Sequence, residues 1–260
     1  MMTIQANLVE NFPADRIVSD MPEVTFQIAR SGPERRLQAF KVAADNRTTV
    51  LDALFAIQRE QDPTLSFRCS CRVGMCGTCA MTINWVPRLA CQTRVETLKA
   101  GVITVGPLHN LPVLKDLIVS LEPFFEKWKR VRPALHPVRE GMTELAIVRP
   151  DSEFGRQAQV KRDCITCGAC YGACGILGAS DGYLGPAAIN RALLRLLDPR
   201  DGAVEERLEV LNAEEGVWRC HTQFNCVAAC PKGINLTDSI MKVKRSLLFP
   251  RQFRNKPKAP

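Results

Sequence analysis

The sequence predicts an α+β fold in which a small mixed sheet is followed by a helical unit. Short strand patterns occupy roughly the first 120 residues, and apolar stripes of helical period replace them afterwards. Eleven of the twelve cysteines fall into three groups, one in the first part and two in the second. We therefore predict two domains, 1–120 and 121–260, which is a usual division for a chain of 260 residues.

The first part contains the signals expected of short strands and one helix. Thr48 or Thr49 is placed to cap a helix that carries Val50, Leu54 and Ile57 on one face. Strands are expected over 24–28, 37–42, 80–83, 88–91 and 102–105. A mixed sheet with one helix, interrupted by a cysteine loop, is the arrangement that a plant-type ferredoxin needs.

The second part contains two clear helical stripes. Pro186 suits the first position of a helix that bears Ile189 and Leu193 and stops at Asp198 before Pro199. The other stripe comprises Leu236, Ile240, Val243 and Leu247. Both stripes are typical of core packing, so the chemistry of this part is expected in its cysteine motifs.

The first cysteine group has an x4-x2 loop and a distant fourth member, which matches a known [2Fe–2S] ligand pattern. Its members are Cys71, Cys76, Cys79 and Cys91. Gly74 and Gly77 allow the backbone to wrap around sulfur with its N–H groups inward. A zinc knuckle is the alternative, although zinc sites usually pair two x2–4 elements. Cys69 does not fit the spacing and is interpreted as a small packed thiol.

The second group matches a bacterial spacing in which the fourth cysteine serves a different cluster. Its members are Cys164, Cys167, Cys170 and Cys174. Under that exchange, the first three need a fourth thiolate from the third group. Cys230, which precedes Pro231, is the candidate, and the four together predict a [4Fe–4S] cluster.

Three thiolates then remain for the last cluster: Cys174, Cys220 and Cys226. The position where a fourth cysteine would stand holds Gln223. We therefore predict [3Fe–4S], with the alternative of a [4Fe–4S] cluster whose fourth iron binds water or Gln223. His221 follows Cys220 directly and is interpreted either as scaffold or as a proton or quinone contact.

The composition indicates which compartment and which partners to expect. Cysteines clustered in a long chain favour metal ligation in a reducing compartment, and residues 1–22 resemble neither a secretory nor a mitochondrial targeting segment. No apolar run of about 18 residues is present. The net charge is +8, with a basic stretch from residue 242 onward that suits anionic lipid, an acidic subunit or a solvated tail. Nucleic acid is not expected as a partner, since no reader motif accompanies the charge.

The order of the motifs resembles the iron–sulfur subunit of succinate dehydrogenase and quinol:fumarate reductase. The resemblance extends from about residue 24 to 248, and the ligand exchange matches the family pattern residue by residue. It is carried by CRVGMCGTCAM (71–81), PVLKDL (112–117), RCHTQFNC (219–226) and CPKG (230–233).

The resemblance implies a β-grasp ferredoxin domain followed by an α-helical ferredoxin domain. It also implies the non-flavin, electron-transfer subunit of a succinate dehydrogenase or fumarate reductase. Such a subunit links an FAD-bearing flavoprotein to a cytochrome b-type membrane anchor that binds quinone near the [3Fe–4S] cluster and often haem b. We expect a peripheral subunit on the cytoplasmic face of a prokaryotic inner membrane.

Two positions depart from many ubiquinone-linked members of the family. Those members have proline and tryptophan where this chain has Gly175 and Ala179, and the tryptophan usually helps to bind the quinone headgroup. The run around Cys174 is more similar to the menaquinone-linked branch. Two alternatives remain: the iron–sulfur subunit of another flavoenzyme, such as a thiol:fumarate or heterodisulfide-type reductase, and a non-catalytic metal scaffold.

Overall fold

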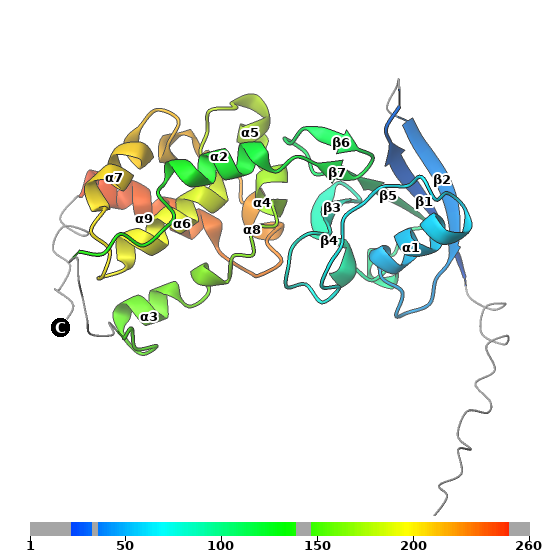
Figure 1. Ribbon diagram of the computed structural model, residues 1–260, viewed down its shortest axis with the longest axis horizontal. Helices are drawn as coiled ribbons and strands as arrows, with labels where there is room; N and C mark the ends of the chain where they lie inside the picture. Colours follow the sequence, from blue (N-terminus) through cyan, green and yellow to red (C-terminus); the bar gives the residue numbers. More distant parts are fainter. Residues whose placement is uncertain (1–21, 33–35, 139–146, 250–260) are drawn as a thin grey trace, which may run out of the picture.

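The computed structural model describes residues 22–32, 36–138 and 147–249. A β unit and a helical unit lie side by side along the long axis of the molecule (Figure 1). The predicted α+β fold is confirmed. Within the described residues, no helix combines the length and the apolar character needed to cross a bilayer.

The β unit is built on a mixed sheet of five strands in the order β2-β1-β5-β3-β4. β1 pairs antiparallel with β2 and parallel with β5, which makes the sheet mixed as predicted. A separate two-stranded hairpin, β6 and β7, follows. The strands are β1 (Glu23–Arg30), β2 (Arg36–Ala43), β3 (Ala80–Ile83), β4 (Val86–Leu89), β5 (Val102–Gly106), β6 (Val113–Lys115) and β7 (Ile118–Val119).

Helix α1 (Val50–Glu60) packs on this sheet and has its predicted apolar face, because Val50, Leu54 and Ile57 are fully buried. The sequence left two candidate caps, and the structure selects Thr49. The Thr49 hydroxyl accepts a hydrogen bond from the backbone N–H of Asp52 at 3.2 Å, and the Asp52 carboxylate accepts one from the backbone N–H of Thr49 at 3.0 Å. This capping box satisfies two N–H groups at the helix start.

The strand predicted over 88–91 is wrong in its position. β4 ends at Leu89, and Ala90–Gln92 form a 3-10 helix, η1. Pro87 lies within β4, where it is tolerated because β4 is an edge strand of the sheet. The 3-10 turn carries Cys91 away from the strand direction. Neither β6 nor β7 was predicted, because their segments are too short to show an alternating pattern.

The helical unit is centred on α6, which packs against α9. Both begin where the sequence predicts, and the buried side chains of Ile189, Leu193, Ile240 and Val243 meet in one core cluster. The helices are α2 (Glu122–Arg130), α3 (Glu153–Ala158), α4 (Ala169–Gly172), α5 (Gly175–Ala179), α6 (Pro186–Leu197), α7 (Val204–Asn212), α8 (Asn225–Ala228) and α9 (Leu236–Leu248).

The basic stretch at the end of the chain is partly engaged within the fold. Lys242 pairs with Asp238 at 3.2 Å, and the Lys244 ammonium donates to the backbone carbonyl of Cys220 at 2.9 Å. Four further cations of the stretch lie outside the described residues: Arg251, Arg254, Lys256 and Lys258.

A buried arginine holds the connection between α2 and the rest of the helical unit. Arg207 on α7 is fully buried and pairs with the buried carboxylate of Asp201. Its remaining N–H groups donate to the carbonyls of Arg132 and Ala134 at 2.8 and 2.9 Å. One guanidinium therefore neutralises a buried carboxylate and ties the segment after α2 to α7.

We expect Arg207→Met to destabilise the chain by about 3 kcal/mol or more, because Asp201 would remain buried without its cation. The thermal unfolding midpoint should fall by about 6 to 12 °C for a chain of this size. Lys129→Gln is the control, since Lys129 forms only an exposed pair with Glu126 and should change little. Equal midpoints for both variants would contradict the role given to Arg207.

Candidate metal centres

The first cysteine loop points its backbone N–H groups at its own sulfur atoms. The Cys71 sulfur accepts from the N–H groups of Met75 and Cys76, both at 3.2 Å. The Cys76 sulfur accepts from the Thr78 hydroxyl at 3.1 Å and from the N–H of Cys71 at 3.5 Å. Gly74 has a φ of 73°, which is the left-handed conformation that lets the loop curl. Thr78 was not singled out from the sequence, although its position between two cysteines is a usable signal.

The other two cysteines of the first group lie next to strands of the sheet. Cys79 immediately precedes β3, Cys91 lies in η1, and the N–H of Ala90 donates to the Cys79 carbonyl at 3.1 Å. The Thr78 hydroxyl lowers the pKa of Cys76 to about 6. Burial is the main cause that raises the pKa of Cys79 to about 12, and Cys91 and Cys76 contribute to this rise as nearby like charges. The four thiols thus form one group whose mutual repulsion iron would relieve.

Cys69 is half-buried and packs against the core of the β unit. This placement agrees with the interpretation of a small packed thiol.

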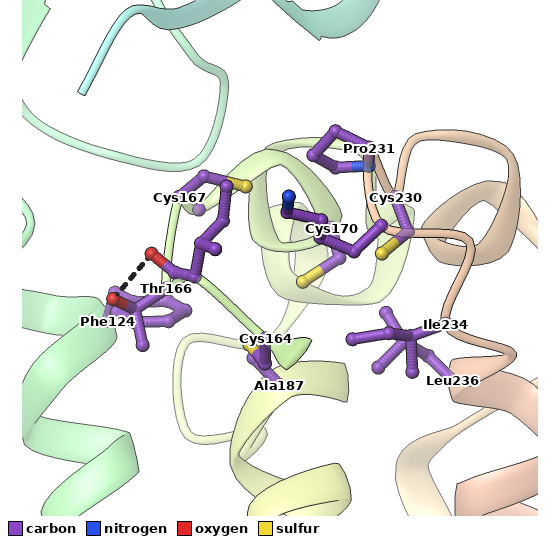
Figure 2. A pocket seen from close by; sticks show the side chains of 13 residues that line it. Phe124, Cys164, Thr166, Cys167, Cys170, Ala187, Cys230, Pro231, Ile234 and Leu236 are labelled. Carbon is purple, nitrogen blue, oxygen red and sulfur yellow. Dashed lines mark hydrogen bonds between the residues drawn. The ribbon is translucent and has the colours of Figure 1, made fainter. Parts of the chain in front are cut away.

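Four cysteines of the second and third groups line one pocket in the helical unit, and Figure 2 shows their side chains around a common space. They are Cys164, Cys167, Cys170 and Cys230. Burial raises the pKa of Cys167 to about 11 and that of Cys170 well above its ordinary value, and neighbouring thiolates add to both shifts. Phe124, Ile234 and Leu236 form part of an apolar lining. Such a dry, thiol-lined pocket suits an iron–sulfur cluster, because soft thiolates bind iron while apolar walls exclude water.

A second pocket gathers the three remaining cysteines: Cys174, Cys220 and Cys226. Cys174 lies between α4 and α5, Cys220 follows the 3-10 helix η4 (Val217–Arg219), and Cys226 lies in α8. The Cys220 sulfur accepts from the N–H of Thr222 at 3.4 Å, and the Cys226 sulfur lies 3.8 Å from the Thr237 hydroxyl. The buried Tyr183 hydroxyl also reaches this pocket without a hydrogen-bond partner. A pocket with three cysteine sulfurs and an unpaired hydroxyl donor suits an iron–sulfur cluster, because such a cluster carries negative charge on its sulfur atoms.

Gln223 and His221 lie at the exposed side of the second pocket. A Cβ atom at Gly175 would lie 3.0 Å from the Gln223 side-chain oxygen, so this amide rests against the backbone just after Cys174. His221 lines the same pocket but is exposed. Both side chains are therefore placed where the pocket meets the surface.

The loop that holds Cys174 has a clamp that sequence reasoning missed. The side-chain amide of Asn110 donates to the carbonyls of Tyr171 and Cys174 at 3.0 and 2.9 Å. Asn110 lies between β5 and β6, and nothing in its local pattern indicates a contact with residues about 60 positions later.

No group of three or more His, Cys, Asp or Glu side chains in the described ranges is placed to hold a single metal ion. In an iron–sulfur cluster the thiolates are distributed over several irons, so their sulfurs need not meet at one point.

The loops of the first two centres touch. A Cβ atom at Gly77 would lie 2.6 Å from the Cβ of Cys167, so only glycine allows this approach. The Lys232 ammonium, two residues after Cys230, lies 3.8 Å from the Met75 sulfur. The contact between the β unit and the helical unit is therefore made by the residues that surround the cysteines.

Two family models match the chain. One, described as a 2Fe-2S iron-sulfur cluster binding domain, matches residues 25–126. The other, described as a 4Fe-4S dicluster domain, matches residues 161–234. Together they cover all three cysteine groups.

Similar proteins share nearly their whole length with this chain. A fumarate reductase iron-sulfur subunit of Mycobacterium tuberculosis is 36% identical over 249 residues, which cover 88% of this chain and 98% of the relative. A protein of the same name from Haemophilus influenzae is 33% identical over 243 residues, covering 87% and 94%. A chain of the Mycobacterium smegmatis Sdh1 complex in the apo form matches with a TM-score of 0.81 and 27% identity, covering 89% of this chain and 98% of that one.

The glycine contact generates a prediction. Gly77 and Gly74 both have a φ of 73°. Replacement of either one by alanine should therefore lower the free energy of unfolding by about 1 to 2 kcal/mol through backbone strain. Gly77→Ala should lower the free energy of unfolding by about 1 to 3 kcal/mol more, because the added methyl group would collide with the backbone and side chain of Cys167. At Gly74 the neighbour is the flexible Gln92 side chain. Thermal unfolding and iron content of the purified variants measure the difference, and equal losses would contradict the tight contact.

Proposed function

This chain belongs to the family of fumarate reductase and succinate dehydrogenase iron–sulfur subunits, and we propose from this premise that it relays electrons between FAD and quinone. FAD would lie in a flavoprotein subunit, and quinone in a cytochrome b-type membrane anchor of the kind that often binds haem b. The relay itself is the electron-transfer role of the family. The observation that carries the proposal is the grouping of eleven cysteines around three separate centres.

We propose the following ligands for the three clusters. Cys71, Cys76, Cys79 and Cys91 hold [2Fe–2S]; Cys164, Cys167, Cys170 and Cys230 hold [4Fe–4S]; Cys174, Cys220 and Cys226 hold [3Fe–4S]. The two pockets of the helical unit support this division, since each draws cysteines from both motifs. When bound, the clusters supply one-electron chemistry, and the chain supplies ligands, hydrogen bonds to sulfur and a dry surrounding.

The three-iron assignment depends on Gln223. A neutral amide is a poor substitute for a thiolate, so one corner of a four-iron cluster would lack a strong ligand. The Gln223 side-chain oxygen lies close to Gly175, just after Cys174, which supports residue 223 as the position of the missing ligand.

The contacts between the centres support the proposed order of the relay. The Gly77–Cys167 approach supports direct passage between the first two centres. Cys170 in α4 and Cys174 just after it belong to different centres, so one short helix supports passage between the last two. We propose the domain division 1–120 and 121–260, between the end of β7 and the start of α2.

Exposed apolar side chains near the two ends of this path support two docking sites. Val73 and Met75 in the first loop are 65% and 62% exposed, which suits a flavoprotein contact. Phe224, next to the last pocket, is 56% exposed, and Phe249 at the end of α9 is 72% exposed. We assign the latter side to the membrane anchor, with His221 as a quinone or proton contact. The chain would be a peripheral subunit on the cytoplasmic face of a prokaryotic inner membrane.

Purification of the tagged chain from its native membranes in mild detergent tests this function. An FAD-containing subunit and a quinone-binding anchor should copurify, and succinate should reduce the clusters within the complex. If the chain carries its clusters but copurifies with a flavoprotein that does not react with succinate, the relay stands and the proposed donor is wrong.

Gln223→Cys tests the vacant ligand position. An added thiolate should hold a fourth iron and lower the potential of the terminal cluster, because it adds negative charge. Low-temperature EPR should show loss of the oxidised three-iron signal. Gln223→Ala removes the amide without adding a ligand and should retain that signal. An unchanged spectrum and potential in Gln223→Cys would exclude residue 223 as the missing ligand.

A further inference from the structure

Tyr183 carries a buried hydroxyl group that the fold itself does not use. The residue lies just before α6 and is 1% exposed. Its hydroxyl has no hydrogen-bond partner among the residues that the structure describes. Leaving such a group unpaired in the protein interior costs about 1 to 3 kcal/mol, so an acceptor for this hydroxyl is expected in the functional protein.

The hydroxyl is directed toward the last cysteine pocket. Tyr183 lines that pocket together with Cys174, Cys220 and Cys226. Burial raises the pKa of Tyr183 well above its ordinary value, and Cys220 raises it further both as a nearby charge and as a hydrogen-bond acceptor. The geometry falls short of a completed bond, so the phenol is an unused donor beside the Cys220 sulfur. It stays protonated at any physiological pH.

We propose that Tyr183 donates a hydrogen bond to the Cys220 thiolate of the terminal centre and thereby raises the reduction potential of that centre. This rests on the proposed function, in which Cys220 is a cluster ligand. Tyr183 is then a positioning and tuning residue for electron transfer. It does not exchange a proton in the step.

The direction of the effect follows from charge. When the terminal centre takes up one electron from the preceding centre, negative charge on its sulfur atoms increases. A hydrogen-bond donor stabilises the more negative, reduced state more than the oxidised state. The effect is strengthened in this pocket, because the low local dielectric weakens screening.

The other donors to this centre are of a different kind. Thr222 contributes a backbone N–H to Cys220, which any residue at that position would supply. On the other side, the Thr237 hydroxyl lies 3.8 Å from the Cys226 sulfur, and either atom can be the donor. Tyr183 is the donor whose removal is chemically clean, since phenylalanine keeps the buried ring and deletes only the hydroxyl.

The chain offers a matched control in its other tyrosine, Tyr171. Tyr171 is also buried in the helical unit, but its hydroxyl accepts from the Lys127 ammonium at 2.8 Å, and it does not line the last pocket. Tyr171→Phe therefore removes the same atom from a comparable site without removing a donor to the terminal centre.

The test is an EPR-monitored redox titration of the assembled complex. Tyr183→Phe should lower the reduction equilibrium constant of the terminal cluster about tenfold, which for one electron is a shift of about 59 mV. The potentials of the other two clusters should stay unchanged, and Tyr171→Phe should leave all three unchanged. An intact terminal cluster with an unaltered potential in Tyr183→Phe would overturn the inference.

A second measurement applies if Tyr183→Phe loses the cluster. Uniform replacement of tyrosine by 3-fluorotyrosine keeps the ring and hydroxyl but makes the phenol a stronger donor, so the terminal potential should rise. An unchanged potential would overturn the inference. Absence of a three-iron signal in the unmodified complex would instead overturn the proposed ligand set, so the two failures are distinguishable.

Discussion

Thiolates repel one another, and burial makes each of them harder to form, so a group of cysteine sulfurs inside a protein is stable only around positive charge. In this chain the raised pKa values of Cys167, Cys170 and Cys79 express that cost. Iron offsets it, and binding of the metal is thereby coupled to folding. The pockets are therefore structural centres of the fold as well as redox sites.

Each of the two pockets is lined by cysteines from both motifs, and this sharing ties distant segments together. The pocket with Cys230 joins the start of α4 to the segment before α9, and the pocket with Cys174 joins the end of α4 to α8. The rest of the helical unit supports this pairing: α6 and α9 form the apolar core, and Arg207 fixes the segment after α2. The β unit then docks with its own loop, where Gly77 allows contact with Cys167. The contacts that hold the fold together are thus the same ones through which the proposed relay would run.

Local signals predicted much of this structure. Strands around 24–28, 80–83 and 102–105, the cap of α1 and both long helices follow from patterns confined to a few neighbouring residues. The position of β4 was missed because an edge strand tolerates Pro87. Features that depend on distant segments meeting were also missed: the approach of Gly77 to Cys167, the clamp by Asn110 and the unpaired hydroxyl of Tyr183. Cysteine spacing carries long-range information only because each cluster requires a fixed number of thiolates.

The central claim is that the last cluster has three thiolate ligands and lacks a fourth. This cluster is proposed to be the last in the chain to receive electrons that come from succinate. Low-temperature EPR of the complex in its native membranes tests it most directly. The air-oxidised sample should show a near-isotropic [3Fe–4S] signal, and succinate should abolish it while a [2Fe–2S] signal appears. An oxidised sample without the three-iron signal, in membranes where succinate does produce the [2Fe–2S] signal, would contradict the three-ligand account.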